Sequence, residues 1–231
     1  MLDRRPATPA RGLAALAVLF SVAWVAGGPA LRATDAGPAA LRPARPLLER
    51  VRSQLTGRAG LRADFTQVSE WAALGEADTS EGTLSVAASG LFRLDYRRPR
   101  GHRIGCDGAR VWTFVPDERQ VLCARVRQTT GWSGLFLESL EDPADSLASV
   151  VVSPDRGEVA RIALRSRPEW ELAALYIEIA VSPGRPVGYG YTDAEGNRIC
   201  FRFRDARFVA EFPDTLFRFR VPSGYELFET D

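Results

Sequence analysis

The stretch Phe92–Pro99, FRLDYRRP, followed by Ile104–Phe114, IGCDGARVWTF, decides how we expect this chain to fold. In the first part, aromatic and apolar residues alternate with charged ones, which is the period of a strand with one buried face. Pro99 ends that strand, because proline cannot donate a hydrogen bond to a neighbouring strand. In the second part, Asp107-Gly108 lies between two apolar runs and indicates a hairpin. The sequence therefore predicts an antiparallel sheet.

The same alternation continues along most of the chain on both sides of this stretch. Turn residues separate the alternating runs, so each run predicts a short strand paired with its neighbour. Trp71–Ser80 carries acidic and small residues and predicts a loop or a frayed hairpin. In all, about 10–11 strands are expected, and those outside the opening stretch are Leu61–Gln67, Gly82–Val86, Val121–Val126, Val150–Ser153, Val159–Leu164, Leu175–Val181, Val187–Tyr191, Ile199–Phe203 and Phe217–Phe219.

Two segments have apolar residues at helical spacing. Pro46 suits the first position of a helix, and an apolar stripe on one side of that helix is formed by Leu47, Leu48, Val51 and Leu55. The sheet is the obvious surface for that stripe to pack on. Gly131–Leu140 predicts a short apolar helix between strands, where it would cap one end of the sheet.

The N-terminus has the pattern of a secretory signal peptide. Arginines precede an uncharged run rich in Ala, Val and Leu, and small residues follow it. We expect a signal peptide over 1–30 and a flexible leader over 31–45, which leaves 46–231 as one domain. An uncleaved membrane anchor is the competing interpretation, because the apolar run approaches the ~20 residues that span a bilayer.

Three cysteines remain in the exported part of the chain. Cys106 and Cys123 flank the hairpin that contains Trp112, and a disulfide between them is one interpretation. The other interpretation is that all three cysteines, including Cys200, are small buried residues without a disulfide. Neither interpretation suggests a metal site, because the sequence has no CxxC motif and no paired Cys/His spacing.

The sequence contains no recognisable catalytic set. His102 is the only histidine, and Ser133 in a Gly-Trp-Ser-Gly context has no histidine to activate it. A formal net charge of +1 gives no electrostatic case for binding nucleic acid. We therefore expect a protein that is not an enzyme, needs no cofactor and binds no nucleic acid.

Aromatic residues are abundant, with twelve Phe, five Trp and five Tyr. A strongly curved sheet needs bulky inward residues to fill it, and that is one explanation. The other is a sheet that is incompletely filled and holds an apolar ligand under a helical lid. Composition leaves both open.

The order of the motifs resembles that of one family, the periplasmic outer-membrane lipoprotein carriers called LolA. The similar pieces cover about residues 46–228 and are Phe65-Thr66-Gln67, Glu81-Gly82-Thr83-Leu84, Leu91–Tyr96 with Pro99, Asp107-Gly108 with the Val-Trp-x-Phe run, Gln120-Val121, Asp193–Asn197, Phe201, Phe217–Phe219 and Pro222–Tyr225.

This resemblance implies a mainly β (α+β) fold, an unclosed and strongly curved antiparallel β-barrel with a helical lid. It implies a periplasmic monomer that ferries acylated lipoproteins from an inner-membrane releasing transporter to an outer-membrane receptor. Each buried CH2 group of an acyl chain contributes ~0.8 kcal/mol, so such a carrier needs only a dry apolar groove. The residues expected in the acyl cavity and lid are Phe65, Leu84, Phe92, Leu94, Tyr96, Trp112, Phe114, Trp132, Leu135 and Phe136.

One departure from the family pattern concerns the lid. LolA proteins usually have an arginine just before the Leu/Phe pair that ties the lid to the barrel, whereas this chain has Ala87-Ala88-Ser89. Arg93 is near, but the alternation puts it on the strand face opposite Phe92. Two alternatives therefore stand beside the lipoprotein carrier: a carrier of another lipid or acylated molecule, and a protein-binding module that uses the exposed edge of the sheet.

Overall fold

A computed structural model describes residues 44–55, 57–126, 147–153, 158–164 and 172–230. The expected signal peptide, the leader up to residue 43 and the helix at 131–140 lie outside these residues. The described elements are α2 (Ala44–Leu55), β1 (Gly60–Trp71), β2 (Glu76–Ala87), β3 (Phe92–Arg98), β4 (Arg103–Cys106), β5 (Arg110–Val115), β6 (Gln120–Arg125), β7 (Leu147–Ser153), β8 (Val159–Leu164), β9 (Leu172–Ala180), β10 (Arg185–Asp193), β11 (Arg198–Val209) and β12 (Glu226–Thr230).

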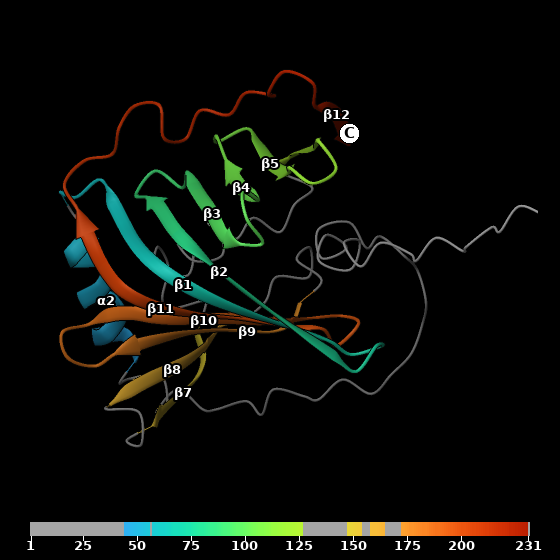
Figure 1. Ribbon diagram of the computed structural model, residues 1–231. Coiled ribbons are helices and arrows are strands. Elements are labelled where there is room, and N and C mark those ends of the chain that lie inside the picture. Colours follow the sequence, from blue (N-terminus) through green and yellow to red (C-terminus); the bar gives the residue numbers. More distant parts are fainter. Residues whose placement is uncertain (1–43, 56, 127–146, 154–157, 165–171, 231) are drawn as a thin grey trace, which may run out of the picture. The chain divides into compact units, whose positions relative to one another are not determined.

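All twelve of these strands form one sheet, in the order β12-β6-β5-β4-β3-β2-β1-β11-β10-β9-β8-β7. Every pair is antiparallel except β12 with β6, which is parallel. Within the described residues, the two end strands β12 and β7 do not pair with each other, so the sheet is unclosed. The prediction of a mainly β, unclosed antiparallel sheet is confirmed (Figure 1).

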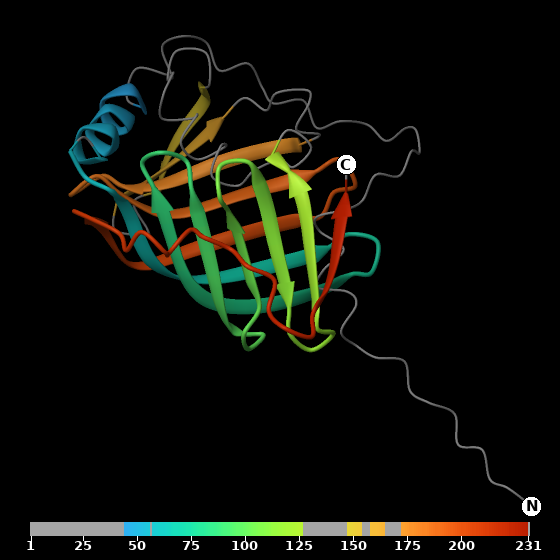
Figure 2. The ribbon, with the colours of Figure 1, turned by 90° about the horizontal axis from the view of Figure 1, so that it is seen from above.

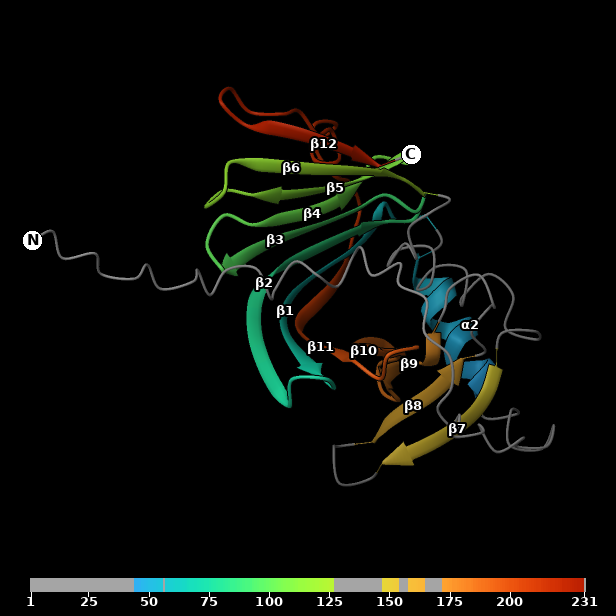
Figure 3. The same cartoon turned by 90° about the vertical axis from the view of Figure 1, so that its right-hand side faces the viewer.

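The sheet is strongly curved, and irregularities in its ladders account for part of that curvature. The register shifts between Arg62 and Asp64 on β1, between Glu81 and Gly82 on β2, and between Pro186 and Gly188 on β10. Such bulges bend a strand and increase its local twist. Figure 3 shows the sheet curving around the side on which α2 lies. We call this concave face the inward face and the other the outward face.

The inward face carries the apolar core. Many of its apolar side chains are at most 4% exposed, because successive residues of a strand point to opposite faces and most of the apolar ones point to this face. The largest of them are Phe65, Leu84, Phe92, Leu94, Ile162, Leu175, Ile177, Tyr189, Ile199 and Phe201.

Helix α2 packs by the apolar stripe that the sequence predicts. Leu48 and Val51 are fully buried. The polar side of the helix is held by the turn between β9 and β10, where Arg50 Nη1 donates to the Val181 carbonyl at 3.1 Å and Gln54 Nε2 to the Pro183 carbonyl at 3.0 Å. No helix within the described ranges is both long and apolar enough to cross a membrane.

Two local predictions were wrong or incomplete. Trp71–Ser80 is a regular hairpin, in which β1 and β2 pair up to Trp71 and Glu76 and the Gly75 amide donates to the Trp71 carbonyl at 2.9 Å. Phe217–Phe219 is not a strand but part of the irregular segment between β11 and β12. The strand nearest the C-terminus is β12, which the sequence did not indicate.

The disulfide interpretation was also wrong. Cys106 lies on β4 and Cys123 on β6, with β5 between them. Cys106 pairs with Val111 and Cys123 with Trp112, so the two thiols point to opposite faces of the sheet. Both cysteines are free and buried.

Candidate functional site

The centre of the inward face is an aromatic cluster around Phe65. Its ring meets Tyr96 edge-on at a centroid distance of 5.2 Å and Phe201 at 5.6 Å. Phe65 pairs with Gly82 on β2, and a Cβ atom at Gly82 would lie 2.6 Å from the ring. Gly82 therefore makes the space that lets the Phe65 ring lie flat across β2.

The tyrosines of the inward face are held neutral. Burial raises the pKa of Tyr96, Tyr189 and Tyr191 above the ordinary value, because the phenolate would lose its hydration. The Tyr96 hydroxyl donates to Gln67 Oε1 at 2.7 Å. These phenols thus add hydroxyl dipoles but no charge at neutral pH.

Five of the residues expected at an acyl cavity lie together on this face. Phe65, Leu84, Phe92, Leu94 and Tyr96 come from the adjacent strands β1, β2 and β3, and pairing such as Leu84 with Leu94 places them side by side. Phe201, Tyr189 and Ile177 extend the same surface over β11, β10 and β9. Sequence reasoning omitted these three, although the alternation of their strands could have found them.

Trp112 and Phe114 do not belong to this surface. Trp112 pairs with Gly105 and Phe114 with Arg103, whose neighbours on β3 are Arg93 and Asp95 rather than Phe92 and Leu94. Both aromatics therefore lie on the outward face, and their grouping with the inward residues was wrong. The other expected members, Trp132, Leu135 and Phe136, lie outside the described residues.

The outward aromatics form a second core under the C-terminal segment. Trp112, Phe114, Val121 and Cys123 are buried there, and Phe219 and Tyr225 pack on them. The Phe219 ring lies 6.4 Å from Trp112 and 6.2 Å from Phe114, measured between ring centroids. Figure 2 shows the segment, in red, crossing the green strands before it joins the sheet as β12.

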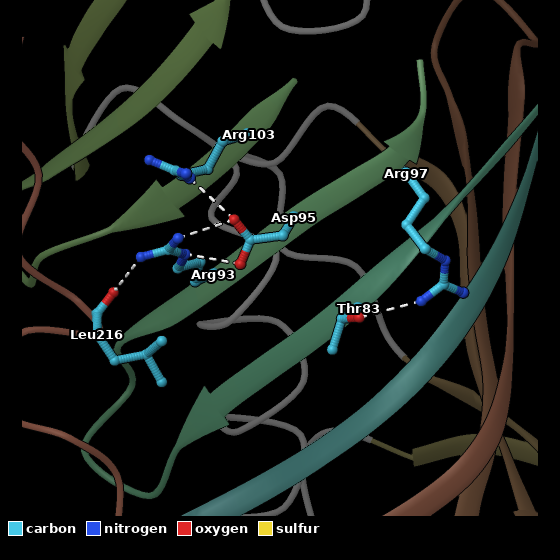
Figure 4. A network of polar contacts seen from close by, with 6 residues as sticks. All are labelled: Thr83, Arg93, Asp95, Arg97, Arg103 and Leu216. Atoms are coloured by element: carbon cyan, nitrogen blue, oxygen red, sulfur yellow. Dashed lines mark hydrogen bonds and ion pairs between the residues drawn. The ribbon is translucent and has the colours of Figure 1, made fainter. Parts of the chain in front are cut away.

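A charged network fastens this segment to β3 (Figure 4). Arg93 donates to both carboxylate oxygens of Asp95, at 2.7 and 2.9 Å, and Arg103 donates to Oδ1 at 2.9 Å. Arg93 Nη1 also donates to the Leu216 carbonyl at 3.0 Å. As the alternation predicts, Arg93 faces away from Phe92.

The Asp95 network gives a pH-dependent prediction. Burial opposes ionisation of Asp95, but the hydrogen bonds from Arg93 and Arg103 outweigh it, so the pKa of the carboxyl is below its ordinary value. A carboxyl group whose pKa is lower in the folded than in the unfolded chain stabilises the fold at pH values above its unfolded pKa of about 4. This stabilisation is lost as the pH falls through the folded pKa. Because the Asp95 side chain is 42% exposed, we expect Asp95→Asn to cost only about 1 kcal/mol at pH 7.

Urea unfolding at pH 7 and at pH 3 checks this. The difference in free energy of unfolding between wild type and Asp95→Asn should be smaller at pH 3 than at pH 7. Asp117→Asn is the matched control, since the Asp117 side chain is 80% exposed and lies 3.5 Å from His102 Nε2. A cost for Asp95→Asn that is the same at both pH values would contradict the role of the ionised carboxylate.

Comparison with known proteins identifies the family. The profile described as "Outer membrane lipoprotein carrier protein LolA" matches residues 57–220, which is most of the chain. The chain belongs to the LolA family. The resemblance inferred from the ordered motifs is thereby confirmed.

Relatives within the LolA family are of modest similarity. The outer-membrane lipoprotein carrier protein of Methylococcus capsulatus is 28% identical over 182 residues, covering 78% of this chain and 86% of that protein. The corresponding protein of Neisseria gonorrhoeae is 25% identical over 169 residues, covering 73% and 80%. A crystal structure of an uncharacterized conserved protein from Thermus thermophilus has a TM-score of 0.50 at 15% identity, covering 81% of this chain and 99% of that one, which shows a similar fold.

The place of the usual LolA-family arginine is a tight turn here. The Ala87 amide donates to the Leu91 carbonyl at 2.7 Å, the Gly90 amide to the Ala87 carbonyl at 3.0 Å, and the Ala88 amide to the Ala59 carbonyl at 2.8 Å. None of these residues has a side chain that could form an ion pair. Arg93, the nearest candidate substitute, is committed to Asp95 and Leu216 on the outward face.

The described part of this LolA-family chain shows no group of three His, Cys, Asp or Glu side chains that could hold a metal ion. His102 lies in the β3–β4 turn, where its carbonyl accepts a hydrogen bond from the Tyr96 amide at 2.9 Å and its ring lies beside Asp117, 3.5 Å from the carboxylate. What the inward face offers is an uncharged aromatic centre, which can bind an apolar chain by burial and by ring contacts.

Proposed function

We propose that this protein is a periplasmic carrier that binds the acyl chains of lipoproteins on the inward face of its sheet. The observation that carries the proposal is the continuous apolar surface over β3, β2, β1, β11, β10 and β9, on a sheet that is not closed into a barrel. Family membership and the names of the relatives support the cargo class. The inner-membrane transporter and the outer-membrane receptor are the partners that this role requires.

The inward face must open before it can receive an acyl chain. Phe65, Leu84, Phe92 and Leu94 are only 0–3% exposed. Each CH2 group that enters contributes ~0.8 kcal/mol, so a long chain can repay the separation of packed apolar surfaces. This carrier would bind without catalysis, since burial alone supplies the affinity.

The turn at Ala87–Gly90 favours a second candidate within the same class. Without an arginine at that place, the contact that ties the family's lid to its barrel cannot form from this turn. A carrier that relaxes this control could accept another lipid or acylated molecule, so the cargo test below includes a fatty acid.

Photocrosslinking tests the proposal on the unaltered protein. The probe is a tripalmitoylated cysteinyl peptide with a diazirine in one acyl chain, and the products are mapped by peptide mass spectrometry. Crosslinks are expected on inward residues such as Phe65, Leu94 and Phe201. A diazirine fatty acid and the peptide without acyl groups are run in parallel.

The outward aromatics provide an internal control, since Trp112 and Phe114 are also large and apolar but face the other way. Crosslinks confined to them, or no crosslinks at all, would refute acyl binding on the inward face. Crosslinks from the fatty acid but not from the acylated peptide would favour the second candidate.

A further inference from the structure

We propose that a pocket on the outward face binds a phosphate group carried on an apolar body. The pocket has a volume of about 500 Å3, within the range of small-molecule sites. Thr66, Glu178, Arg202 and Arg204 supply its polar lining, and valines such as Val187 part of its apolar lining. Because the four polar residues lie on the outward face, this site is separate from the acyl-binding face proposed above.

The pocket arises from a gap in a row of paired residues across the sheet. Glu178 on β9 pairs with Gly188 on β10, Gly188 pairs with Arg202 on β11, and Arg202 pairs with Thr66 on β1. Gly188 has no side chain, so the row is hollow between Glu178 and Arg202. A Cβ atom there would lie 2.6 Å from Glu178 Oε2, which shows that the hollow depends on glycine.

The negative charge of the Glu178 carboxylate in the pocket wall is balanced by an arginine of the protein itself. Glu178 is 7% exposed although it is on the outward face, and Arg161 on β8 donates to its Oε1 atom through both Nε, at 3.0 Å, and Nη2, at 2.6 Å. The Arg161 guanidinium also lies over the Tyr176 ring, 4.4 Å from its centroid. Glu178 is thereby held in place and does not repel an anion as an unpaired carboxylate would.

The two arginines of the pocket are available to a ligand. Both are exposed, and neither side chain forms an ion pair or hydrogen bond with any residue in the part of the chain that the structure describes. Arg204 attracts Asp64 only from a distance, since the Asp64 carboxylate bonds Arg97 at 3.1 Å. Arg198, on the same strand and face, is different: it pairs with Glu70 at 3.2 Å.

These donors match a phosphate better than a carboxylate. Guanidinium groups bind phosphate oxygens through paired, charge-assisted hydrogen bonds. Two guanidinium groups and the Thr66 hydroxyl can donate hydrogen bonds to three oxygen atoms, one more than a carboxylate has. The apolar part of the lining and the volume leave room for a body attached to the phosphate, such as the glycerol and first methylenes of a phospholipid.

Isothermal titration at low salt tests the site with three probes: inorganic phosphate, dihexanoylphosphatidylglycerol as a monomer, and vesicles of phosphatidylglycerol. Replacing both pocket arginines, in Arg202→Gln/Arg204→Gln, should weaken binding about tenfold or more, as expected for lost charge-assisted hydrogen bonds. The control Arg198→Gln removes one of the same kind of charge from the same strand face, where the double variant removes two, and should change binding less than about twofold.

The pattern among probes identifies the source of the phosphate. Inorganic phosphate that binds as tightly as the short-chain lipid, with the same dependence on the two arginines, supports a site for free phosphate and overturns the part of the proposal that concerns the apolar body. Lipid binding without phosphate binding supports a headgroup site. Failure of all three probes to bind, or equal weakening by Arg198→Gln and the double variant, would overturn the proposal in favour of no site or of general surface charge. All substitutions are at exposed residues, and urea unfolding verifies that each variant is folded.

Discussion

Phe65→Ala is expected to lower the free energy of unfolding by about 3–5 kcal/mol. The Phe65 ring is fully buried and meets both Tyr96 and Phe201 edge-on. Removing it loses the transfer free energy of the ring and leaves a cavity that the sheet can close only in part. The loss also removes two aromatic contacts, each contributing ~1 kcal/mol.

Urea unfolding followed by circular dichroism measures this effect. Phe65→Leu keeps most of the volume and should cost about half as much or less. Phe228→Ala is the matched control, because Phe228 on β12 is 41% exposed and its removal should cost under about 0.5 kcal/mol. A cost below about 1 kcal/mol for Phe65→Ala would mean that the centre of the inward face is loosely filled, and the sheet would then be open to ligand at rest.

The sequence was sufficient to predict the inward face where a strand has only one buried face. On β3, Phe92, Leu94 and Tyr96 alternate with Arg93 and Asp95, so the pattern itself identifies the buried side. The same holds for β1 around Phe65. Pairing the strands by their turns then brings these residues together, which is why five of the expected site residues lie side by side.

The sequence was not sufficient where both faces of a strand are buried. From Val111 to Val115 every residue of β5 is buried, so no alternation distinguishes the two faces. The register of β5 on β4 places Trp112 on the outward face, and it is buried there because Phe219, more than a hundred residues further along the chain, covers it. A contact over such a distance leaves no local pattern.

The sequence did not predict the structure of the C-terminal segment correctly, for a related reason. The alternation of Phe217, Arg218 and Phe219 fits a strand, yet Phe217 contacts Phe212 and Phe219 contacts Trp112 instead of pairing in a ladder. A short segment whose apolar side chains pack on a surface has the same sequence pattern as a short segment that pairs as a strand. The disulfide interpretation had the same weakness, because it depended on the register and on β5 lying between the two cysteines.

Gly105→Ala should displace the Phe219 ring from the outward core and lower the free energy of unfolding by about 1–3 kcal/mol. Gly105 on β4 lies beneath Phe219, and an added Cβ atom would overlap the Phe219 ring. The ring would have to leave, and Trp112, now 9% exposed, would become accessible. Acrylamide quenching of tryptophan fluorescence measures that exposure, and urea unfolding measures the cost.

A double-mutant cycle with Phe219→Ala attributes the effect to this one contact. Without the Phe219 ring, Gly105→Ala should cost clearly less than in the wild-type background and should no longer increase quenching. Some cost should persist, because the Cβ atom would still lie 2.9 Å from the Phe92 carbonyl oxygen. Equal costs in the two backgrounds would show that the clash is with the sheet itself, and that Phe219 does not hold the C-terminal segment over β4 and β5.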